Sequence, residues 1–310
     1  MIFAGIEFSA HNPGSLQLNS CPIYYSQPYL KQIETEISSF YAIKKDTQQI
    51  LIVIHFQVLN NQAISLRNAP FGGIHFEHAI ETSVFEAFMN FIVTKLKSKR
   101  INEIVIKTAP PCYHDHSHLH WESLNKLGFT NSQDDINHHI EIAQPKITEQ
   151  LSHMQKRRLE KCKKANFQFR KESPTELKRV YNFIVDCRKE KQQSVSVSLN
   201  KLDRLMRLLP DSYLIFCCYD GQRLIAATIC VVVNDLVLYN FFPSSKATYN
   251  TYSPMVFLIS NLYEYCVHYN LKILDLGTSM LDNAPNDKLI AFKNRVGGIA
   301  TKRSIYSMKL

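Results

Sequence analysis

The chain has 310 residues, of which 45% are hydrophobic and 20% charged, and it carries a net charge of +9. This length exceeds one average domain, so two domains of about 150 residues are expected. Its apolar runs are shorter than the roughly 18 residues of a membrane span, and its start lacks a signal-peptide pattern. Its eight cysteines show no CxxC spacing, so we expect reduced thiols in a cytoplasmic protein.

The first half alternates between strand and helix patterns. Ile50–Leu59 is an almost unbroken apolar run, which is typical of a strand buried on both faces. The elements predicted here, in chain order, are strands Ile50–Leu59 and Ala63–Arg67, helix Glu77–Lys97, strand Glu103–Lys107, helix Leu119–Leu127 and strand Ile136–Ala143.

The second half begins with helices and continues with three consecutive strands. Asp220-Gly221 and Asn234-Asp235 separate these strands as hairpin turns. The predicted elements are helix Thr148–Ala165, a strand near Phe167–Phe169, helices Thr175–Lys191 and Leu199–Leu208, strands Tyr213–Tyr219, Leu224–Val233 and Leu236–Phe242, helix Pro254–His268, strand Lys272–Leu276, helix Asp287–Asn294 and strand Thr301–Met308. The later part of the first half repeats this order, so the chain is expected to contain one internal repeat.

The basic excess lies in the middle of the chain. Between Lys146 and Arg204 there are 16 basic and 7 acidic residues, and the stretch from Lys156 to Lys164 is the densest part. Such a run is either a solvated helix face or a surface for an anionic partner, such as a nucleotide, a phosphate or tRNA. Few aromatic residues interleave with the basic ones, which argues against a single-stranded nucleic-acid platform.

The helix predicted from Pro254 to His268 has one apolar stripe, formed by Met255, Leu258, Ile259, Leu262, Tyr263, Cys266 and Val267. Ser253 is the expected N-cap, with Pro254 at the first helical position. Free backbone N–H groups at a helix N-terminus attract phosphate or carboxylate, so this end is either an anion site or simply a capped helix. The polar residues expected to contact a substrate here are Ser244, Ser245, Tyr249, Tyr252 and Ser253.

Four groups of residues carry a resemblance to a known family. They are Pro70-Phe71-Gly72-Gly73-Ile74, Pro110-Pro111-Cys112-Tyr113-His114 with Leu127-Gly128-Phe129, the basic stretch from Arg157 to Ala165, and Tyr252-Ser253-Pro254 followed by Asp275-Leu276-Gly277 and Phe292-Lys293. In this order they resemble the FemAB-like acyltransferases, a branch of the GNAT superfamily. The resemblance implies an α/β fold of two tandem GNAT-like domains, 1–145 and 146–310, with mixed central sheets flanked by helices.

The resemblance also implies the reaction. An acyl or aminoacyl group would move to an amine or hydroxyl of a phosphate-bearing small-molecule acceptor, of the cell-envelope or nucleotide-sugar type. The candidate catalytic residues are Lys293, Tyr239 and Asp275, and Arg158 and Tyr113 are further candidates for substrate contact. For each catalytic candidate a structural role is the alternative: a surface lysine, a core tyrosine and a turn aspartate.

The donor stays open between acetyl-CoA or another acyl-CoA and aminoacyl-tRNA. GNAT enzymes that use acetyl-CoA hold its pyrophosphate in a glycine-rich turn, but no glycine lies between Pro243 and Pro254, and side chains block close backbone approach to a phosphate. Fem peptidyltransferases also lack this turn and use aminoacyl-tRNA, but they carry a helical arm that is not found here. The alternatives from other classes are a non-catalytic ligand-binding module on the same fold and a nucleic-acid-binding protein.

A histidine-rich segment from His114 to His120 invites a separate metal hypothesis, because it holds four histidines and an aspartate. No HExxH motif is present, so no metal is expected. The alternatives are substrate contact by Tyr113 or His114 and a plain loop.

Overall fold

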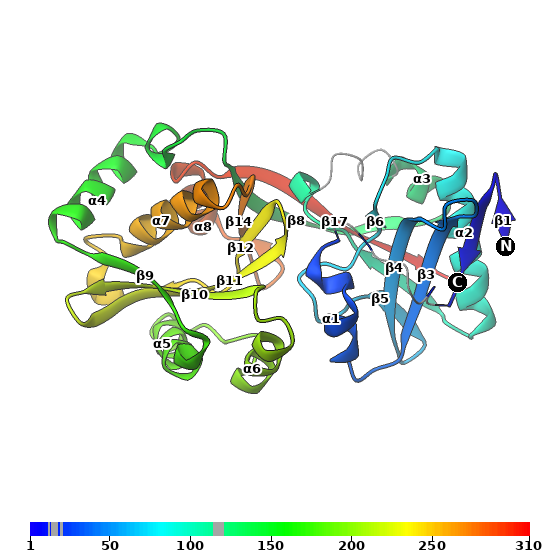
Figure 1. Ribbon diagram of the computed structural model, residues 1–310, viewed down its shortest axis with the longest axis horizontal. Coiled ribbons are helices and arrows are strands. Elements are labelled where there is room, and N and C mark those ends of the chain that lie inside the picture. Colours follow the sequence, from blue (N-terminus) through cyan, green and yellow to red (C-terminus); the bar gives the residue numbers. More distant parts are fainter. Residues whose placement is uncertain (12, 14–17, 19–20, 114–120) are drawn as a thin grey trace. The chain divides into compact units, whose positions relative to one another are not determined.

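The computed structural model describes residues 1–11, 13, 18, 21–113 and 121–310, and its chain forms two compact units (Figure 1). The N-terminal unit comprises Met1–Ile136 together with Thr301–Leu310, and the C-terminal unit comprises Asn137–Ala300. The chain therefore enters the second unit earlier than the expected boundary at residue 145, and its last strand returns to the first unit. No helix among the described residues is both long and apolar enough to span a bilayer.

The N-terminal unit is built on a mixed sheet with the strand order β1-β2-β3-β4-β5-β7-β17-β8. Its strands are β1 (Ile2–Phe3), β2 (Ile6–Ser9), β3 (Ile37–Lys44), β4 (Ile50–Leu59), β5 (Gln62–Ser65), β6 (His75–Phe76), β7 (Glu103–Lys107), the first part of β8 (Thr130–Glu141) and most of β17 (Ile299–Lys309). Its helices are α1 (Gln27–Lys31), α2 (Thr82–Ser98) and α3 (Trp121–Lys126), with short 3-10 turns at Ile23–Tyr25 and Pro111–Tyr113.

The core of this unit lies between the sheet and α2. The first eight residues of β4 are buried, as the unbroken apolar run predicts. From α2 the side chains of Val84, Phe88 and Ile92 enter the same hydrophobic cluster. The sequence gives no clear sign of β3, because the polar residues at its start interrupt the apolar pattern of a strand.

The Gly72-Gly73 turn before α2 is explained by close packing. A Cβ atom on Gly72 would lie 2.4 Å from the Cβ of Leu66, and one on Gly73 would lie 2.9 Å from the Cα of Thr108. Only glycine permits such close approach of two backbones. This turn therefore packs the chain against β5 and β7.

The C-terminal unit has the strand order β8-β14-β12-β11-β10-β9. Its strands are β9 (Gln168–Glu172), β10 (Tyr213–Asp220), β11 (Arg223–Asn234), β12 (Val237–Asn240), β13 (Ser244–Ser245), β14 (Ile273–Thr278), β15 (Met280–Leu281) and β16 (Ala284–Pro285). Its helices are α4 (His153–Lys164), α5 (Leu177–Lys189), α6 (Leu199–Leu208), α7 (Pro254–His268) and α8 (Asp287–Arg295), with 3-10 turns at Ile147–Glu149, Pro174–Glu176 and Ala247–Tyr249.

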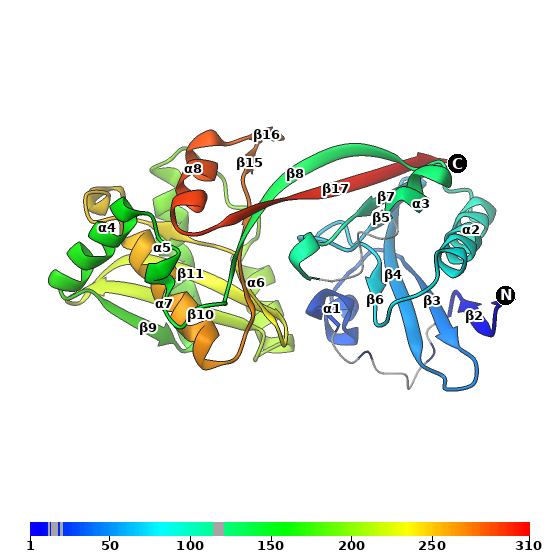
Figure 2. The ribbon, with the colours of Figure 1, turned by 90° about the horizontal axis from the view of Figure 1, so that it is seen from above.

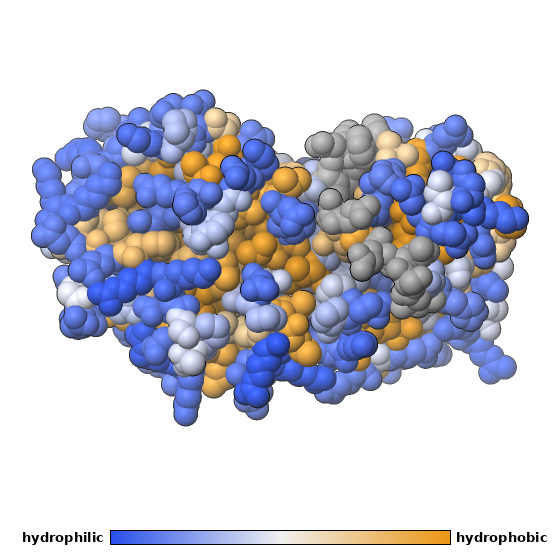
Figure 3. Space-filling model, viewed as in Figure 1, coloured by the Kyte–Doolittle hydropathy of each residue, from blue (hydrophilic) through white to orange (hydrophobic). Residues whose placement is uncertain are grey.

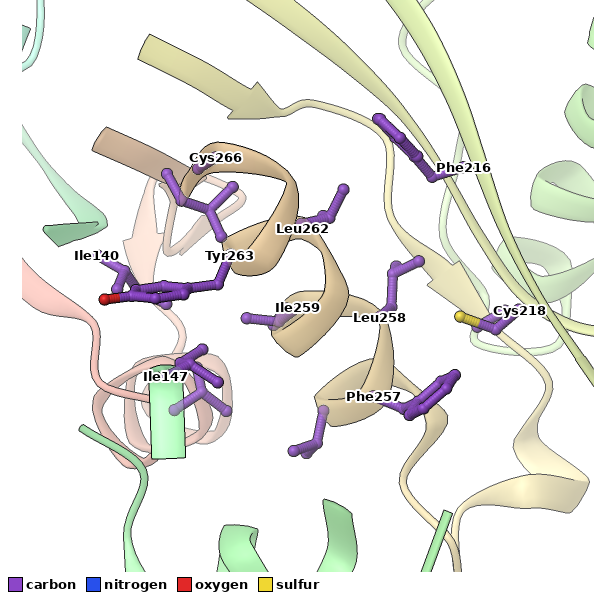
Figure 4. Packing of buried hydrophobic residues seen from close by; sticks show 14 of the residues in the cluster. Ile140, Ile147, Phe216, Cys218, Phe257, Leu258, Ile259, Leu262, Tyr263 and Cys266 are labelled. Carbon is purple, nitrogen blue, oxygen red and sulfur yellow. The ribbon is translucent and has the colours of Figure 1, made fainter. Parts of the chain in front are cut away.

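Helix α7 forms the centre of this unit (Figure 4). Leu258 lies on the side of α7 that faces Phe216 and Cys218, whereas Tyr263 extends toward Ile140. The helix is thus buried over more of its circumference than the single stripe that the sequence predicts. Val267, which was assigned to that stripe, is 36% exposed, so its assignment is wrong.

Two long strands, β8 and β17, lie side by side (Figure 2). The end of β17 pairs antiparallel with β7, from Ile305 opposite Lys107 to Lys309 opposite Glu103. The end of β8 pairs antiparallel with β14. The sheet of the N-terminal unit therefore includes a strand from the end of the chain, β17. The sheet of the C-terminal unit includes the end of β8, the strand in which the chain passes from one unit to the other.

Candidate functional site

Two parallel strands of the C-terminal unit, β12 and β14, separate from each other where their pairing ends. Strands β12 and β14 pair through Tyr239 opposite Asp275. Beyond this pair β14 continues along β8, while the chain after β12 stays with β11 through β13. We call this divergence the splay; ligand sites of α/β proteins commonly lie where the carboxyl ends of neighbouring strands separate.

Lys293, on α8, is a buried cation at the splay. Its side chain is 5% exposed, and its Nζ donates hydrogen bonds to the carbonyl oxygens of Gly277 (2.7 Å) and Thr278 (2.8 Å) at the end of β14. Burial lowers the pKa of Lys293 from its ordinary 10.5 to about 8, and the negative charge of Asp275 acts in the opposite direction. The alternative of a surface lysine is excluded by this burial.

Asp275 holds the end of β14 in place. It is 2% exposed, and its Oδ1 accepts hydrogen bonds from Asn137 Nδ2 (2.9 Å) and from the backbone N–H of Gly277 (2.7 Å). Because Gly277 in turn binds Lys293 through its carbonyl, these contacts fit a role in orienting the lysine.

Tyr239 lies against the same glycine. A Cβ atom at Gly277, whose φ is +74°, would lie 3.0 Å from Cε2 of Tyr239 and 3.2 Å from its hydroxyl oxygen. The half-buried Tyr239 therefore occupies the space that any other residue at position 277 would need. Tyr239 and Lys293 thus both lie at Gly277.

A buried hydrogen-bond network supports α8 from the side of β8. His138 Nε2 lies 3.0 Å from Asn294 Oδ1, and His138 Nδ1 lies 2.9 Å from the hydroxyl of Ser279. Burial lowers the pKa of His138, and the positive charge of Lys293 lowers it further. A neutral ring donates from Nε2 to Asn294 and accepts from Ser279 at Nδ1. The bond to Asn294, which follows Lys293 in sequence, links α8 to β8.

The segment before α7 differs from the expected anion site. Ser253 occupies the N-cap position, but its φ of +63° is left-handed and its side chain makes no capping hydrogen bond, so the prediction of a side-chain cap is wrong. The backbone N–H groups of Tyr252 and Ser253 both donate to the carbonyl of Tyr249, and Val256 donates to Ser253. Pro254 has no N–H.

These hydrogen bonds leave few backbone N–H groups that could bind the pyrophosphate of CoA. A phosphate cradle needs several free N–H groups and close backbone approach, whereas here those of Tyr252, Ser253 and Val256 are occupied and no glycine lies between Pro243 and Pro254. The two serines Ser244 and Ser245 are buried and pair with Ala227 and Ala226 of β11. The residues of this segment therefore do not fit CoA.

Arg188, at the end of α5, is a site residue that sequence reasoning missed. Its guanidinium carbon lies 4.8 Å from the centroid of the Phe242 ring, and its buried Nε has no hydrogen-bond partner among the described residues. Burial lowers the pKa of Arg188, and Tyr239 raises it. Nothing in the sequence distinguishes Arg188 from the other basic residues of the middle segment, because its position depends on how α5 packs.

The structure brings three of the predicted residues together. Lys293, Asp275 and Tyr239 meet at the splay, whereas Arg158 lies half-exposed on α4. Tyr113 lies in the N-terminal unit, where its ring packs 5.2 Å from that of Phe71.

The histidine-rich segment from His114 to His120 lies outside the described residues. Within the described ranges, no group of three or more histidine, cysteine, aspartate or glutamate side chains could hold a metal ion. All eight cysteines are free thiols, and six of them are buried.

Comparisons with known proteins show which domain and which folds this chain is similar to. Residues 153–287 match the family model of the acetyltransferase (GNAT) domain, while no curated protein matches the sequence significantly. Among solved structures, FemX is 9% identical, with 89% of this chain and 88% of FemX covered and a TM-score of 0.67.

Two further structures share the fold. The C-terminal domain of a protein described as a lysylphosphatidylglycerol synthetase, from Agrobacterium fabrum, is 10% identical over 84% of this chain and 81% of that one, with a TM-score of 0.57. A tandem GNAT protein from the clavulanic acid biosynthesis pathway is 9% identical over 88% and 83%, with a TM-score of 0.51.

These similarities confirm the predicted fold class, two GNAT-like halves with mixed sheets flanked by helices. Residues 153–287 thus match a GNAT acetyltransferase domain, and the whole chain shares its tandem fold with FemX and with a tandem GNAT protein.

Proposed function

We propose that the C-terminal unit transfers an aminoacyl or related acyl group from an ester donor to an amine or hydroxyl of an anionic, phosphate-bearing acceptor in the cytoplasm. The observation that carries the proposal is the buried cation of Lys293 at the splay. A buried charge is expensive, and groups with strongly perturbed pKa values concentrate at functional sites.

Lys293 is suited to stabilise the oxyanion of the tetrahedral intermediate. An ammonium group has three N–H donors, and the two carbonyls of Gly277 and Thr278 take two of them. The third is left for negative charge that develops on the donor carbonyl oxygen. A fixed donor in a buried site contributes most to the transition state, since it needs no reorganisation during the reaction.

Tyr239 is suited to move the proton. The acceptor nitrogen or oxygen attacks the donor carbonyl carbon, and the ester C–O bond then breaks. The proton lost by the acceptor passes to the leaving oxygen, and a phenol beside the reacting carbonyl can relay it by accepting one proton and donating another. Asp275 is a positioning residue in this scheme, because its carboxylate binds the strand end rather than the reacting atoms.

The segment before α7 supports an aminoacyl ester as the donor. The occupied N–H groups of Tyr252, Ser253 and Val256 argue against CoA and leave an aminoacyl ester as the donor class. The fold likeness to FemX and to a protein named for lysyl transfer to phosphatidylglycerol supports the same choice.

Arg188 supports an anionic group on the acceptor. The Arg188 guanidinium stacks on Phe242, and its buried Nε has no hydrogen-bond partner in the part of the chain that the structure describes. Such a group suits a phosphate or carboxylate, which guanidinium binds through two parallel hydrogen bonds.

Donor competition tests this proposal. The purified protein is incubated with a UDP-linked amino sugar and either a mixture of aminoacyl-tRNAs or acetyl-CoA, and mass spectrometry follows the acceptor. We expect acceptor mass to increase only with the aminoacyl donor. Transfer from acetyl-CoA, or stabilisation of the fold by CoA in a thermal shift assay, would overturn the assignment of the donor.

A further inference from the structure

Three aromatic rings form a row beside the splay. Tyr239 lies against Gly277, and the centroid of its ring is 5.5 Å from that of Phe241, which follows the end of β12. Phe241 in turn stacks on Phe242, with ring centroids 5.3 Å apart and an angle of 20° between the ring planes. We call Tyr239, Phe241 and Phe242 the aromatic row.

A cation lies at each end of the aromatic row. At one end the guanidinium carbon of Arg188 is 4.8 Å from the centroid of the Phe242 ring. At the other end Lys293 donates to the carbonyl of Gly277, the same residue against which Tyr239 packs. The aromatic row therefore begins at the lysine of the candidate site and ends at a second positive charge.

The rings of the aromatic row differ in exposure. Phe242 is 2% exposed and supports the row from within, whereas Tyr239 and Phe241 are half-buried, so that part of each side chain reaches the surface. In Figure 3 hydrophobic surface gathers near the place where Figure 1 draws β12, while the surface over α4 and β9 is mostly hydrophilic. Ligand pockets are commonly lined in this way, by apolar and aromatic side chains with a few polar groups among them.

We propose that Tyr239 and Phe241 receive the side chain of the acyl group, and that the protein selects aromatic and large apolar aminoacyl groups. The inference rests on the proposed function, in which Lys293 binds the carbonyl oxygen of the donor. The side chain of an aminoacyl group begins close to that carbonyl, so it meets the ring that lies at Gly277 and then the next ring of the aromatic row. Aromatic rings attract one another at centroid distances of about 5–7 Å, beyond the gain from burial.

Cationic and small side chains gain less at the same place. Arg188 repels a positive charge at one end of the aromatic row. The carboxylate opposite Tyr239, that of Asp275, is 2% exposed, and its Oδ1 already accepts two hydrogen bonds. A charge that loses water without gaining a close partner binds poorly, and a methyl side chain covers little of the rings.

Calorimetric titration with inert donor analogues tests this preference, because binding needs no catalysis. The analogues are 3′-aminoacylamino-3′-deoxyadenosines that carry a phenylalanyl, an alanyl or a lysyl group on an amide in place of the reactive ester. We expect the wild type to bind the phenylalanyl analogue about tenfold more tightly than the alanyl and lysyl analogues, since only its ring covers the aromatic row. Equal affinities for the three analogues, or no binding of the phenylalanyl analogue, would overturn the proposal.

Two phenylalanines of the C-terminal unit provide a matched pair of variants. Phe241→Ala should reduce the preference for the phenylalanyl analogue to about twofold or less. Phe169, on the edge strand β9, is also half-buried and stacks on a buried ring, that of Phe216, with centroids 5.4 Å apart. Phe169→Ala should keep the preference of the wild type. Equal losses of preference in the two variants would overturn the assignment to the aromatic row.

This inference and the proposed function can fail separately. If the phenylalanyl analogue binds preferentially through Phe241 but no acyl transfer is detected, the role of the aromatic row stands and the proposed reaction fails. If phenylalanyl, alanyl and lysyl esters are all transferred with equal kcat/KM, the reaction stands and the role of the aromatic row is wrong.

Discussion

At the scale of single residues, the candidate site is defined by a lysine whose burial destabilises the fold. A protonated amine that is 5% exposed has lost most of its hydration, and two backbone carbonyls and the nearby charge of Asp275 offset that loss only in part. A purely structural residue at this position would be apolar. The lysine is therefore explained better by chemistry than by stability.

This destabilisation predicts a pH dependence. The folded-state pKa of Lys293 is about 8, below its ordinary 10.5, so between these values the unfolded chain binds the extra proton and wild-type stability rises with pH. From pH 7 to pH 10, the unfolding free energy of wild type should therefore rise by about 2–3 kcal/mol relative to that of Lys293→Met. Urea unfolding at several pH values measures it, and parallel curves for the two proteins would contradict the burial of a charge.

Gly277 provides a test of the contact with Tyr239. Gly277→Ala places a methyl group 3.0 Å from the ring, whereas Gly221→Ala, at a similarly positive φ, meets nothing within 4 Å. Both substitutions carry the left-handed strain of about 1 kcal/mol. Thermal unfolding should show that Gly277→Ala loses about 1–2 kcal/mol more unfolding free energy than Gly221→Ala. Equal losses would mean that Tyr239 does not pack against Gly277.

At the scale of elements, the sequence predicts helices and central strands well and loop conformations poorly. The bounds of α6, α7, β4 and β7 agree with their predicted ranges, because each has a strong apolar period or an unbroken apolar run. Capping depends on backbone geometry that composition does not specify. Ser198 caps α6 by accepting from the N–H of Lys201, whereas Ser253 is left-handed at the start of α7 and caps nothing.

The two serines make a matched pair of variants. Ser198→Ala removes a capping hydrogen bond of 3.3 Å and should lower the unfolding free energy by about 1 kcal/mol. Ser253→Ala removes no capping bond and should change it by less than about 0.5 kcal/mol. Chemical denaturation of both variants checks this, and a larger loss for Ser253→Ala would contradict the assignment of the caps.

At the scale of the whole molecule, the tandem repeat could be predicted, but not the path of the chain through it. The last strand was expected in the second domain, yet it pairs with β7 of the N-terminal unit. Strand partners far apart in sequence leave no periodic signal, because any apolar strand satisfies the same pattern. The position of Arg188 over Phe242 was missed for the same reason, since it depends on tertiary packing.

The N-terminal unit contains its own pH-sensitive group. His55 on β4 is 1% exposed and bonds Ser39 through Nδ1 (2.8 Å). Burial, and then the charge of His75, lowers the pKa of His55 from 6.5 to about 3. The neutral ring is required in the folded state, so wild-type stability should fall as pH decreases from 6.5 toward 3, by up to about 1.4 kcal/mol per pH unit.

The variant His55→Leu removes this dependence. Between pH 6.5 and pH 4.5, urea unfolding should show a stability loss about 2 kcal/mol smaller in the variant than in wild type, and hydrogen exchange at β4 should locate the difference. An identical loss in both proteins would show that His55 does not titrate as its burial requires.

If Lys293 supplies the positive charge for acyl transfer, Lys293→Met should lower kcat for aminoacyl transfer at least 100-fold, as the loss of an oxyanion donor does. Lys288→Met, at an exposed lysine on the same helix α8, should retain the wild-type rate. Wild-type kcat in Lys293→Met, or an equal loss in both variants, would show that Lys293 does not stabilise the transition state.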